Sequence, residues 1–187
     1  KIINSIAKEL VAESPNAIYV VVSNPVDILT YAFIKSTGLP KNQVIGTGTL
    51  LDSSRFRASL SEYFGVSAKS VHGYVFGEHG DSSMIPWSLA TIGGMPITTY
   101  KSRLDGESRN CSPEDKEKIE QNVRESGANV IKMKGATYYA IAMSVKKICE
   151  CIIRDEKSVL SVSTLIDNDY CGISDVCISL PFIVGAK

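Results

Sequence analysis

The sequence lacks an excess of charge of either sign, because 20 lysines and arginines balance 20 aspartates and glutamates over 187 residues. No global electrostatic field therefore favours nucleic acid or an anionic membrane as the partner, and a small molecule is the expected ligand. Apolar runs stay far below the roughly 18 residues that span a bilayer, and no basic segment followed by an apolar one opens the chain. We expect a cytoplasmic protein that contacts neither membrane nor nucleic acid.

Metal-ligand and redox spacings are missing as well. The odd number of cysteines contains no Cys-x-x-Cys pair, the spacing typical of metal and redox sites. The five are Cys111, Cys149, Cys151, Cys171 and Cys177. We therefore expect reduced, mostly buried thiols and no metal.

The dinucleotide-binding fingerprint Gly-x-Gly-x-x-Gly is also absent. Gly46-Thr47-Gly48-Thr49 supplies two of the three glycines, and no acidic residue follows about 20 residues later at a strand end. By itself this segment predicts a flexible turn from a strand into a helix.

What remains is the composition of an ordinary folded protein, with 44% hydrophobic and 21% charged residues. Apolar periodicity predicts helices over 1–14, 26–36, 50–64, 113–133 and 137–153, and strands over 17–22, 43–45, 74–76, 159–166 and 176–180. Alternating helices and strands up to residue 64 favour an α/β fold with a parallel sheet. Strand 17–22 is continuously apolar, as in a strand buried on both faces.

The second half of the chain gives three further expectations. Residues 101–111 have the composition of an exposed loop. Helix 137–153 is apolar nearly all round and is expected to lie buried between layers. Segments 159–166 and 176–180 predict an antiparallel hairpin.

His79 is the first candidate for chemistry. It lies between Gly77 and Gly80, after the apolar run 74–76, so the backbone can turn sharply and present an imidazole at a strand end. Histidine titrates near neutral pH and suits proton transfer. From these residues alone, a loop histidine without a role remains the alternative.

Two more groups of polar residues lie near predicted strand and helix ends. Ser23 and Asn24 follow strand 17–22, and ligands of open α/β sheets bind at the carboxyl ends of strands, although Asn-Pro is also a common turn. Asp52 and Arg55 share one face of helix 50–64. They form either an exposed ion pair or a carboxylate that holds a histidine and an arginine fork that holds a substrate carboxylate.

Four motifs in chain order resemble those of bacterial L-lactate dehydrogenases, and the resemblance covers the whole chain. They are Ser23-Asn24-Pro25-Val26-Asp27, Leu51-Asp52-Ser53-Ser54-Arg55-Phe56-Arg57, Gly77-Glu78-His79-Gly80-Asp81 and Lys134-Gly135-Ala136-Thr137-Tyr138-Tyr139. The resemblance implies an enzyme that interconverts L-lactate and pyruvate by hydride transfer with NAD.

The resemblance also implies a role for each matching residue. His79 is the acid/base that exchanges a proton with the substrate, Asp52 holds its other ring nitrogen, and Arg55 clamps the substrate carboxylate. The remaining positions bind substrate or cofactor: Asn24 touches the substrate oxygen and the nicotinamide, Val22, Ser23 and Thr47 lie along NAD, Thr137 lines the pocket around the substrate methyl, and Ile141 packs on the nicotinamide ring.

The implied architecture is the end of a Rossmann-type parallel sheet followed by a mixed α+β substrate domain. We expect residues 1–46 to belong to the dinucleotide-binding domain and 47–187 to the substrate domain, with helix 137–153 packing back toward the cofactor half. The family's glycine-rich turn, ribose-binding acid, mobile loop with the specificity residue and C-terminal helix have no counterpart here. We therefore expect an internal piece that is inactive by itself.

Arg57 and His72 match family positions that form a fructose 1,6-bisphosphate site at a subunit interface. Arg57 lies about 200° around the helix from Arg55 and should point away from the substrate. His72 is expected at the start of the strand whose far end carries His79, about 23 Å away. The resemblance thus implies a homotetramer that responds to this sugar bisphosphate.

Two other functions remain open. A malate or other L-2-hydroxy acid dehydrogenase of the same superfamily would carry the same residues, and the decisive loop residue is not in this sequence. A non-catalytic binding or assembly module is the other alternative. The joint presence of Asp52, Arg55 and His79 argues against it, because a binding module has no need of all three.

Overall fold

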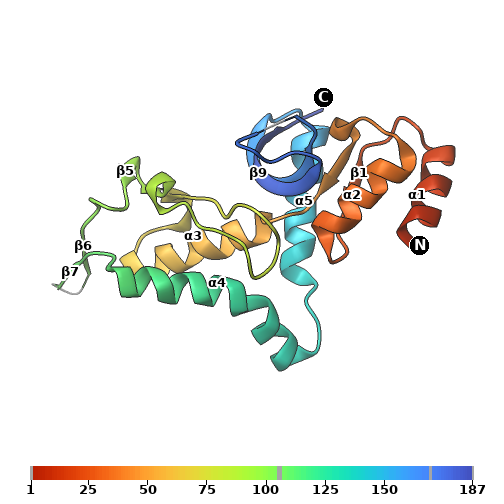
Figure 1. Cartoon of the computed structure of the whole chain (residues 1–187). Coiled ribbons are helices and arrows are strands. Elements are labelled where there is room, and N and C mark those ends of the chain that lie inside the picture. Colours follow the sequence, from red (N-terminus) through yellow and green to blue (C-terminus); the bar gives the residue numbers. More distant parts are fainter. Residues whose placement is uncertain (1, 105–106, 169, 187) are drawn as a thin grey trace.

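The computed structural model describes residues 2–104, 107–168 and 170–186. Figure 1 shows two lobes with a helix and a hairpin between them. One lobe consists of α1 (Ile2–Glu13), β1 (Tyr19–Val21), α2 (Val26–Thr37) and β2 (Val44–Gly46). The other contains α3 (Leu50–Phe64), β3 (Val71–His72), β4 (Thr91–Ile92), β5 (Met95–Pro96), β6 (Ser102–Leu104), β7 (Glu107–Arg109) and α4 (Pro113–Lys134). Between the lobes lie α5 (Tyr139–Ile153), β8 (Ser158–Ile166) and β9 (Val176–Val184).

A four-stranded sheet with the order β1-β2-β8-β9 joins the two ends of the chain. Strands β1 and β2 are parallel, with Val20 opposite Ile45, and α2 is the crossover helix between them. Strand β8 is antiparallel to β2 and to β9, with which it forms a long hairpin. The predicted parallel pair and antiparallel hairpin are both confirmed.

The helix ends follow local sequence signals. Ser112 caps α4 by accepting a hydrogen bond from the N–H of Asp115, whose carboxylate in turn accepts one from the N–H of Ser112. Helices α2, α3 and α4 each end at a glycine with a positive φ, as the sequence predicted. These local signals explain why helix bounds were well predicted.

Three groups of buried apolar residues stabilise these layers. One lies under α3 and α4, one under α1 and α2, and one between α5 and the hairpin. Their largest members include Phe56, Phe64 and Ile119 in the first, Phe33, Ile34 and Val44 in the second, and Leu50, Ile148 and Val162 in the third.

The prediction that residues 137–153 form a helix buried between layers is wrong. Ile148 and Cys151 of α5 are fully buried, but Tyr139, Met143 and Ile153 are 72%, 62% and 82% exposed. One face of α5 packs against the hairpin, and the part of the chain that the structure describes places no layer over the opposite face.

Two strand predictions also need correction. The strand expected over 17–22 is shorter, and only Val21 of β1 is fully buried, because β1 lies at an edge of the described sheet. Residues 101–111, expected as a loop, contain the antiparallel pair β6 and β7, with Arg103 opposite Ser108. Residues 105–106 of that loop lie outside the described residues.

Candidate active site

The main chain before His79 is held by hydroxyl groups. The carbonyl oxygen of Val75 accepts hydrogen bonds from Oγ1 of Thr49 at 2.5 Å and Oγ of Ser161 at 2.6 Å. Its N–H donates to Oγ of Ser53 at 2.9 Å, and all three hydroxyl residues are fully buried. A regular strand over 74–76 was therefore a wrong prediction, since side chains replace the neighbouring strand.

Two isolated backbone pairs then fix the base of the His79 loop. Phe76 pairs with Met84, and Gly77 exchanges two hydrogen bonds of 2.9 Å with Ser179 of β9. Gly77 has φ +89°, a left-handed conformation that favours glycine. The loop that presents His79 therefore starts from an anchored point, although its strand is missing.

His79, Asp52 and Arg55 form one polar cluster. Nδ1 of His79 lies 2.6 Å from Oδ2 of Asp52, whose Oδ1 accepts a hydrogen bond of 3.2 Å from Nη1 of Arg55. Asp52 is only 7% exposed and lies in the first turn of α3, where the helix dipole favours a negative charge. The exposed i,i+3 pair that the sequence left open is thus a half-buried three-membered cluster.

The pKa of His79 is raised above its ordinary value of 6.5. The hydrogen bond to Asp52 is the main cause, and burial of the ring opposes it. The negative charges of Asp52 and Asp27 raise this pKa further, whereas the positive charge of Arg55 lowers it. The imidazole is therefore more readily protonated near neutral pH than a free histidine.

The cluster faces a cavity of about 520 Å³ between the lobes. Residues from both lobes line it, including every catalytic, substrate-binding and cofactor-binding candidate of the sequence. These are Val22, Ser23, Asn24, Thr47, Asp52, Arg55, His79, Thr137 and Ile141. The fold thus brings together residues that lie up to 119 positions apart, with Val22 and Ile141 at the two ends of the range.

Two charged residues of the site were missed by sequence reasoning. Asp27, in the first turn of α2, accepts a hydrogen bond of 2.9 Å from the backbone N–H of His79. Arg124 of α4 lines the cavity and donates to the carbonyl of Ser83 and to Glu120. Asp27 can be explained as an acid near a helix start, and Arg124 as an arginine on a polar helix face. The one signal in the sequence was that Asp27 lies three residues after Asn24, in the same motif.

Arg57 and His72 lie outside this cavity. Arg57 donates hydrogen bonds to the carbonyl of Gly73 and to Oγ of Ser54, and burial lowers its pKa. His72 is exposed, and its strand β3 ends there, so the expected continuous strand from His72 to His79 is not formed. The hydroxyl contacts of Val75 take the place of strand partners there.

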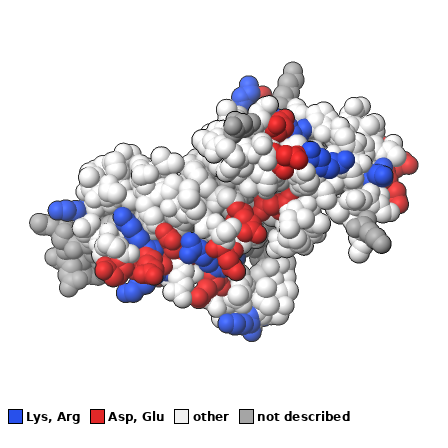
Figure 2. Space-filling view, viewed as in Figure 1, with Lys and Arg blue, Asp and Glu red and all other residues white. Residues whose placement is uncertain are grey.

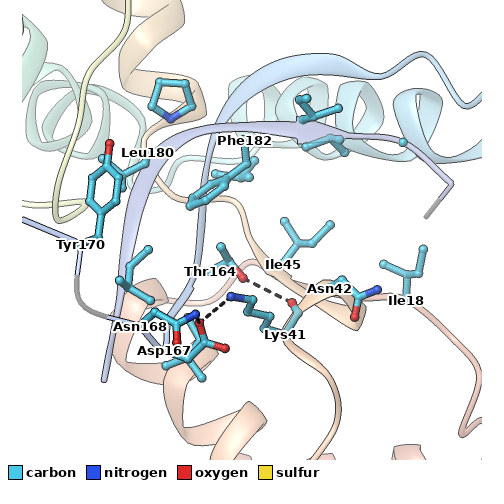
Figure 3. Close-up of a pocket in the computed structure, with 17 residues that line it drawn as sticks. Ile18, Lys41, Asn42, Ile45, Thr164, Asp167, Asn168, Tyr170, Leu180 and Phe182 are labelled. Atoms are coloured by element: carbon cyan, nitrogen blue, oxygen red, sulfur yellow. Dashed lines mark hydrogen bonds and ion pairs between the residues drawn. The ribbon is translucent and has the colours of Figure 1, made fainter. Parts of the chain in front are cut away.

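A second cavity, of about 490 Å³, lies beside the hairpin (Figure 3). Ile45, Leu180 and Phe182 contribute apolar surface, and Lys41 forms an ion pair of 2.5 Å with Asp167 at its polar side. None of the predicted site residues lines this cavity.

Charges of both signs mix on the face shown in Figure 2, most visibly along α4, and no field of one sign gathers there. Within the described ranges, no helix is both long and apolar enough to cross a bilayer. The same residues contain no cluster of three or more histidine, cysteine or acidic side chains suited to a metal ion.

A crossover-linked parallel strand pair, a second α/β lobe and a histidine–carboxylate pair in the cavity between them define a class, the two-domain α/β proteins with a site at the carboxyl ends of parallel strands. Family comparison agrees with this classification. Residues 1–46 match the NAD binding domain of lactate/malate dehydrogenase, and residues 49–187 match its alpha/beta C-terminal domain. The chain belongs to the lactate/malate dehydrogenase family.

Similar proteins carry the name L-lactate dehydrogenase. The chain is 50% identical to L-lactate dehydrogenase 1 of Clostridium acetobutylicum over 98% of its own length and 58% of that protein. It is 46% identical to L-lactate dehydrogenase of Acetivibrio thermocellus over 100% of its length and 58% of that protein.

Solved structures agree in fold. L-lactate dehydrogenase from Clostridium thermocellum superposes with a TM-score of 0.86 at 44% identity, over 99% of this chain and 59% of that one. The minor L-lactate dehydrogenase from Enterococcus mundtii, in its ligand-bound form, superposes with a TM-score of 0.89 at 40% identity, over 99% of this chain and 57% of that one. The chain thus spans less than two thirds of the length of these relatives.

Proposed function

We propose that the enzyme to which these residues belong interconverts L-lactate and pyruvate by hydride transfer with NAD, and that His79 is its acid/base. The observation that carries the proposal is the 2.6 Å pairing of His79 with Asp52 beside Arg55, within one cavity. Pairing through Nδ1 fixes the ring orientation and leaves Nε2 as the nitrogen that faces the substrate.

His79 moves the proton in both directions. In reduction, the protonated ring donates from Nε2 to the C2 oxygen as negative charge develops there. In oxidation, the neutral ring accepts the hydroxyl proton. Asp52 stabilises the imidazolium, and the raised pKa of His79 favours the donor form.

Arg55 is the proposed clamp for the substrate carboxylate. Its Nη1 already donates to Asp52, but a guanidinium has five N–H donors, so others remain for two parallel hydrogen bonds to a carboxylate. Thr137, which also lines the cavity, is proposed to surround the substrate methyl group.

The residues present fit the nicotinamide end of NAD, which supplies or accepts the hydride when bound. Val22, Ser23 and Asn24 follow β1 and Thr47 follows β2, at the carboxyl ends of two parallel strands, where such ligands bind. Asn24 is proposed to hydrogen-bond the substrate oxygen and the carboxamide side of the cofactor. Ile141 offers an apolar surface to the ring.

A dicarboxylate such as oxaloacetate is the second candidate substrate, because Arg124 adds a second cation to the cavity wall. Glu120 pairs with Arg124 at 3.2 Å and offsets that charge, which favours the monocarboxylate. The decisive measurement compares pyruvate and oxaloacetate reduction by an enzyme of full family length that carries these residues. Preference for oxaloacetate would reverse the assignment, and NADH binding without any turnover would support a binding module.

We also propose a homotetramer that responds to fructose 1,6-bisphosphate through Arg57 and His72. Arg57 is half-buried, and the hydrogen-bond partners found for it in the described ranges are neutral. A desolvated guanidinium of this kind suits a phosphate, and the exposed His72 adds an imidazole donor.

The proposed domain division assigns 1–46 to the cofactor domain and 47–187 to the substrate domain. Because the 187 residues contain no Gly-x-Gly-x-x-Gly turn to hold a pyrophosphate, we propose that they do not turn over lactate by themselves. Calorimetric titration of NADH into the chain tests this division, and measurable His79-dependent turnover would contradict it.

A further inference from the structure

We propose that Asp27 is a positioning residue for His79, which holds the main chain of the His79 loop and supplies a second carboxylate near the imidazole. Oδ2 of Asp27 accepts the backbone N–H of His79 at 2.9 Å. Asp52 acts on the side chain of the same residue through Nδ1. Two carboxylates from two helices thus fix one histidine at its backbone and at its ring. This inference rests on the proposed role of His79.

The burial of Asp27 indicates that its negative charge interacts with positive charge, in addition to its hydrogen bond to the loop. The residue is 8% exposed, and its Oδ1 is buried without a hydrogen-bond partner among the residues that the structure describes. A buried carboxylate is costly unless positive charge compensates it. The amino end of α2 supplies part of that compensation, and the charge of a protonated His79 adds to it.

The other charges around His79 explain why a second carboxylate is useful. Asp52 also pairs with Arg55, whose positive charge lowers the pKa of His79. Arg124 adds a second positive charge to the same cavity. Asp27, in the first turn of α2, opposes the effect of Arg55 on the pKa of His79.

Three more titratable groups lie near the loop. Glu78 accepts a hydrogen bond from Ser82, and Asp81 lines the cavity and is exposed to solvent, which screens its charge. Cys177 of β9 is buried, and burial together with the charge of Asp27 raises the pKa of its thiol to about 12. The negative charge of Asp27 therefore favours the protonated form of both neighbours, the imidazolium of His79 and the neutral thiol of Cys177.

Asp27 also connects the two substrate-facing sides of the cavity. It lies three residues after Asn24, which follows β1, and its carboxylate reaches a loop of the other lobe. The amino end of α2 thereby sets the distance between the proposed carbonyl-binding amide and the acid/base. A hydrogen bond across the lobes restrains that distance.

Histidine titration in an enzyme of full family length tests the charge. The ring signal of His79, in protein with carbon-13-labelled histidine, is assigned by its loss in His79→Asn. We expect Asp27→Asn to lower the pKa of His79 by about half a unit or more, since an asparagine keeps the acceptor and removes the charge. Asp81→Asn is the matched control and should shift it less. Equal shifts in both variants, or no shift in Asp27→Asn, would overturn the proposal.

Amide exchange of His79 tests the backbone contact. The amide of His79 should stay protected from exchange in Asp27→Asn and lose its protection in Asp27→Ala. If both variants fold and their His79 amides exchange at the same rate, the contact is refuted. If Asp27→Ala does not fold, Asp27→Asn alone tests the proposal through the pH dependence of kcat/KM for pyruvate. The fall of kcat/KM at high pH should then move to lower pH, together with the pKa of His79. If His79→Asn left turnover unchanged, the proposed function would be rejected, but the titration result for Asp27 would still hold.

Discussion

At the scale of single residues, one carboxylate organises the site. Asp52 pairs with His79 through Oδ2 and with Arg55 through Oδ1, so it holds the proposed proton carrier and the proposed carboxylate-binding fork side by side. Because Asp52 is buried, solvent screens these interactions less than it screens an exposed pair. Each member can therefore be tested by a substitution that keeps its size.

Replacing His79 by asparagine should reduce kcat for pyruvate reduction about 100-fold or more, because the general acid is lost. NADH affinity should change little, since the ring contacts the substrate oxygen in our proposal. Steady-state kinetics and a fluorescence titration of NADH measure the two effects. Turnover within about threefold of the parent enzyme would remove His79 from the mechanism.

Replacing Arg55 by lysine keeps the charge but removes the planar fork. Binding of the substrate carboxylate should weaken by about 2 kcal/mol or more, seen as a raised KM for pyruvate. An unchanged KM would show that this arginine does not clamp the substrate.

The stability of the chain should also depend on His79. Its pKa is raised in the folded state, so the folded chain binds this proton more tightly than the unfolded chain does. The resulting stabilisation is complete below the unfolded value of about 6.5 and is lost as the pH rises through the folded pKa. Urea unfolding across this pH range should show a stability difference between the parent and His79→Asn that shrinks at high pH. A constant difference would contradict the linkage.

At the scale of elements, buried hydroxyls connect α3 and β8 to the segment before His79. Thr49 at the start of α3 and Ser161 of β8 both donate to the carbonyl of Val75, and Ser179 of β9 pairs with Gly77 two residues later. The hairpin is thus a support for the catalytic loop and not only a cover for α5.

The variant Thr49→Val tests this support. It keeps the shape of the side chain and removes a buried hydrogen bond, so the free energy of unfolding should fall by about 1 kcal/mol or more. Thr164→Val is the matched control, because its hydroxyl makes only a longer bond of 3.3 Å to the carbonyl of Lys41 at the surface. Chemical denaturation measures both, and equal losses would mean that the hydroxyls near Val75 have no special weight.

At the scale of the whole molecule, the fold separates the cavity from the proposed effector residues. Arg55 and Arg57 lie on one helix, yet only Arg55 lines the cavity, while Arg57 contacts Gly73. A signal from Arg57 can therefore reach the site through α3 without direct contact with the substrate.

We expect fructose 1,6-bisphosphate to lower the KM for pyruvate of the full-length enzyme, with a coupling of about 1–3 kcal/mol. The comparison uses the parent and an Arg57→Gln, His72→Gln double variant. An equal response in both would exclude these two residues from the effector site, and no response in either would mean that the enzyme is not regulated in this way.

The sequence by itself determined the fold class, most helix bounds and nine of the residues that line the cavity. Caps and glycines mark helix ends within a few residues, and three of the four motifs carry Asn24, Asp52, Arg55 and His79, whose residue types and spacing already suggested chemistry. Such signals are local, so a linear pattern is enough to predict them.

Only the tertiary structure decided which partners these segments meet. The bonds from Asp27 to His79 and from Ser161 to Val75 join residues 52 and 86 positions apart, and no local pattern encodes them. The same holds for α5, whose uniform apolar sequence predicts burial but not which face is covered. Hydrogen-bond partners and packing layers are set by the path of the whole chain, because a backbone carbonyl accepts equally well from a neighbouring strand or from a distant hydroxyl.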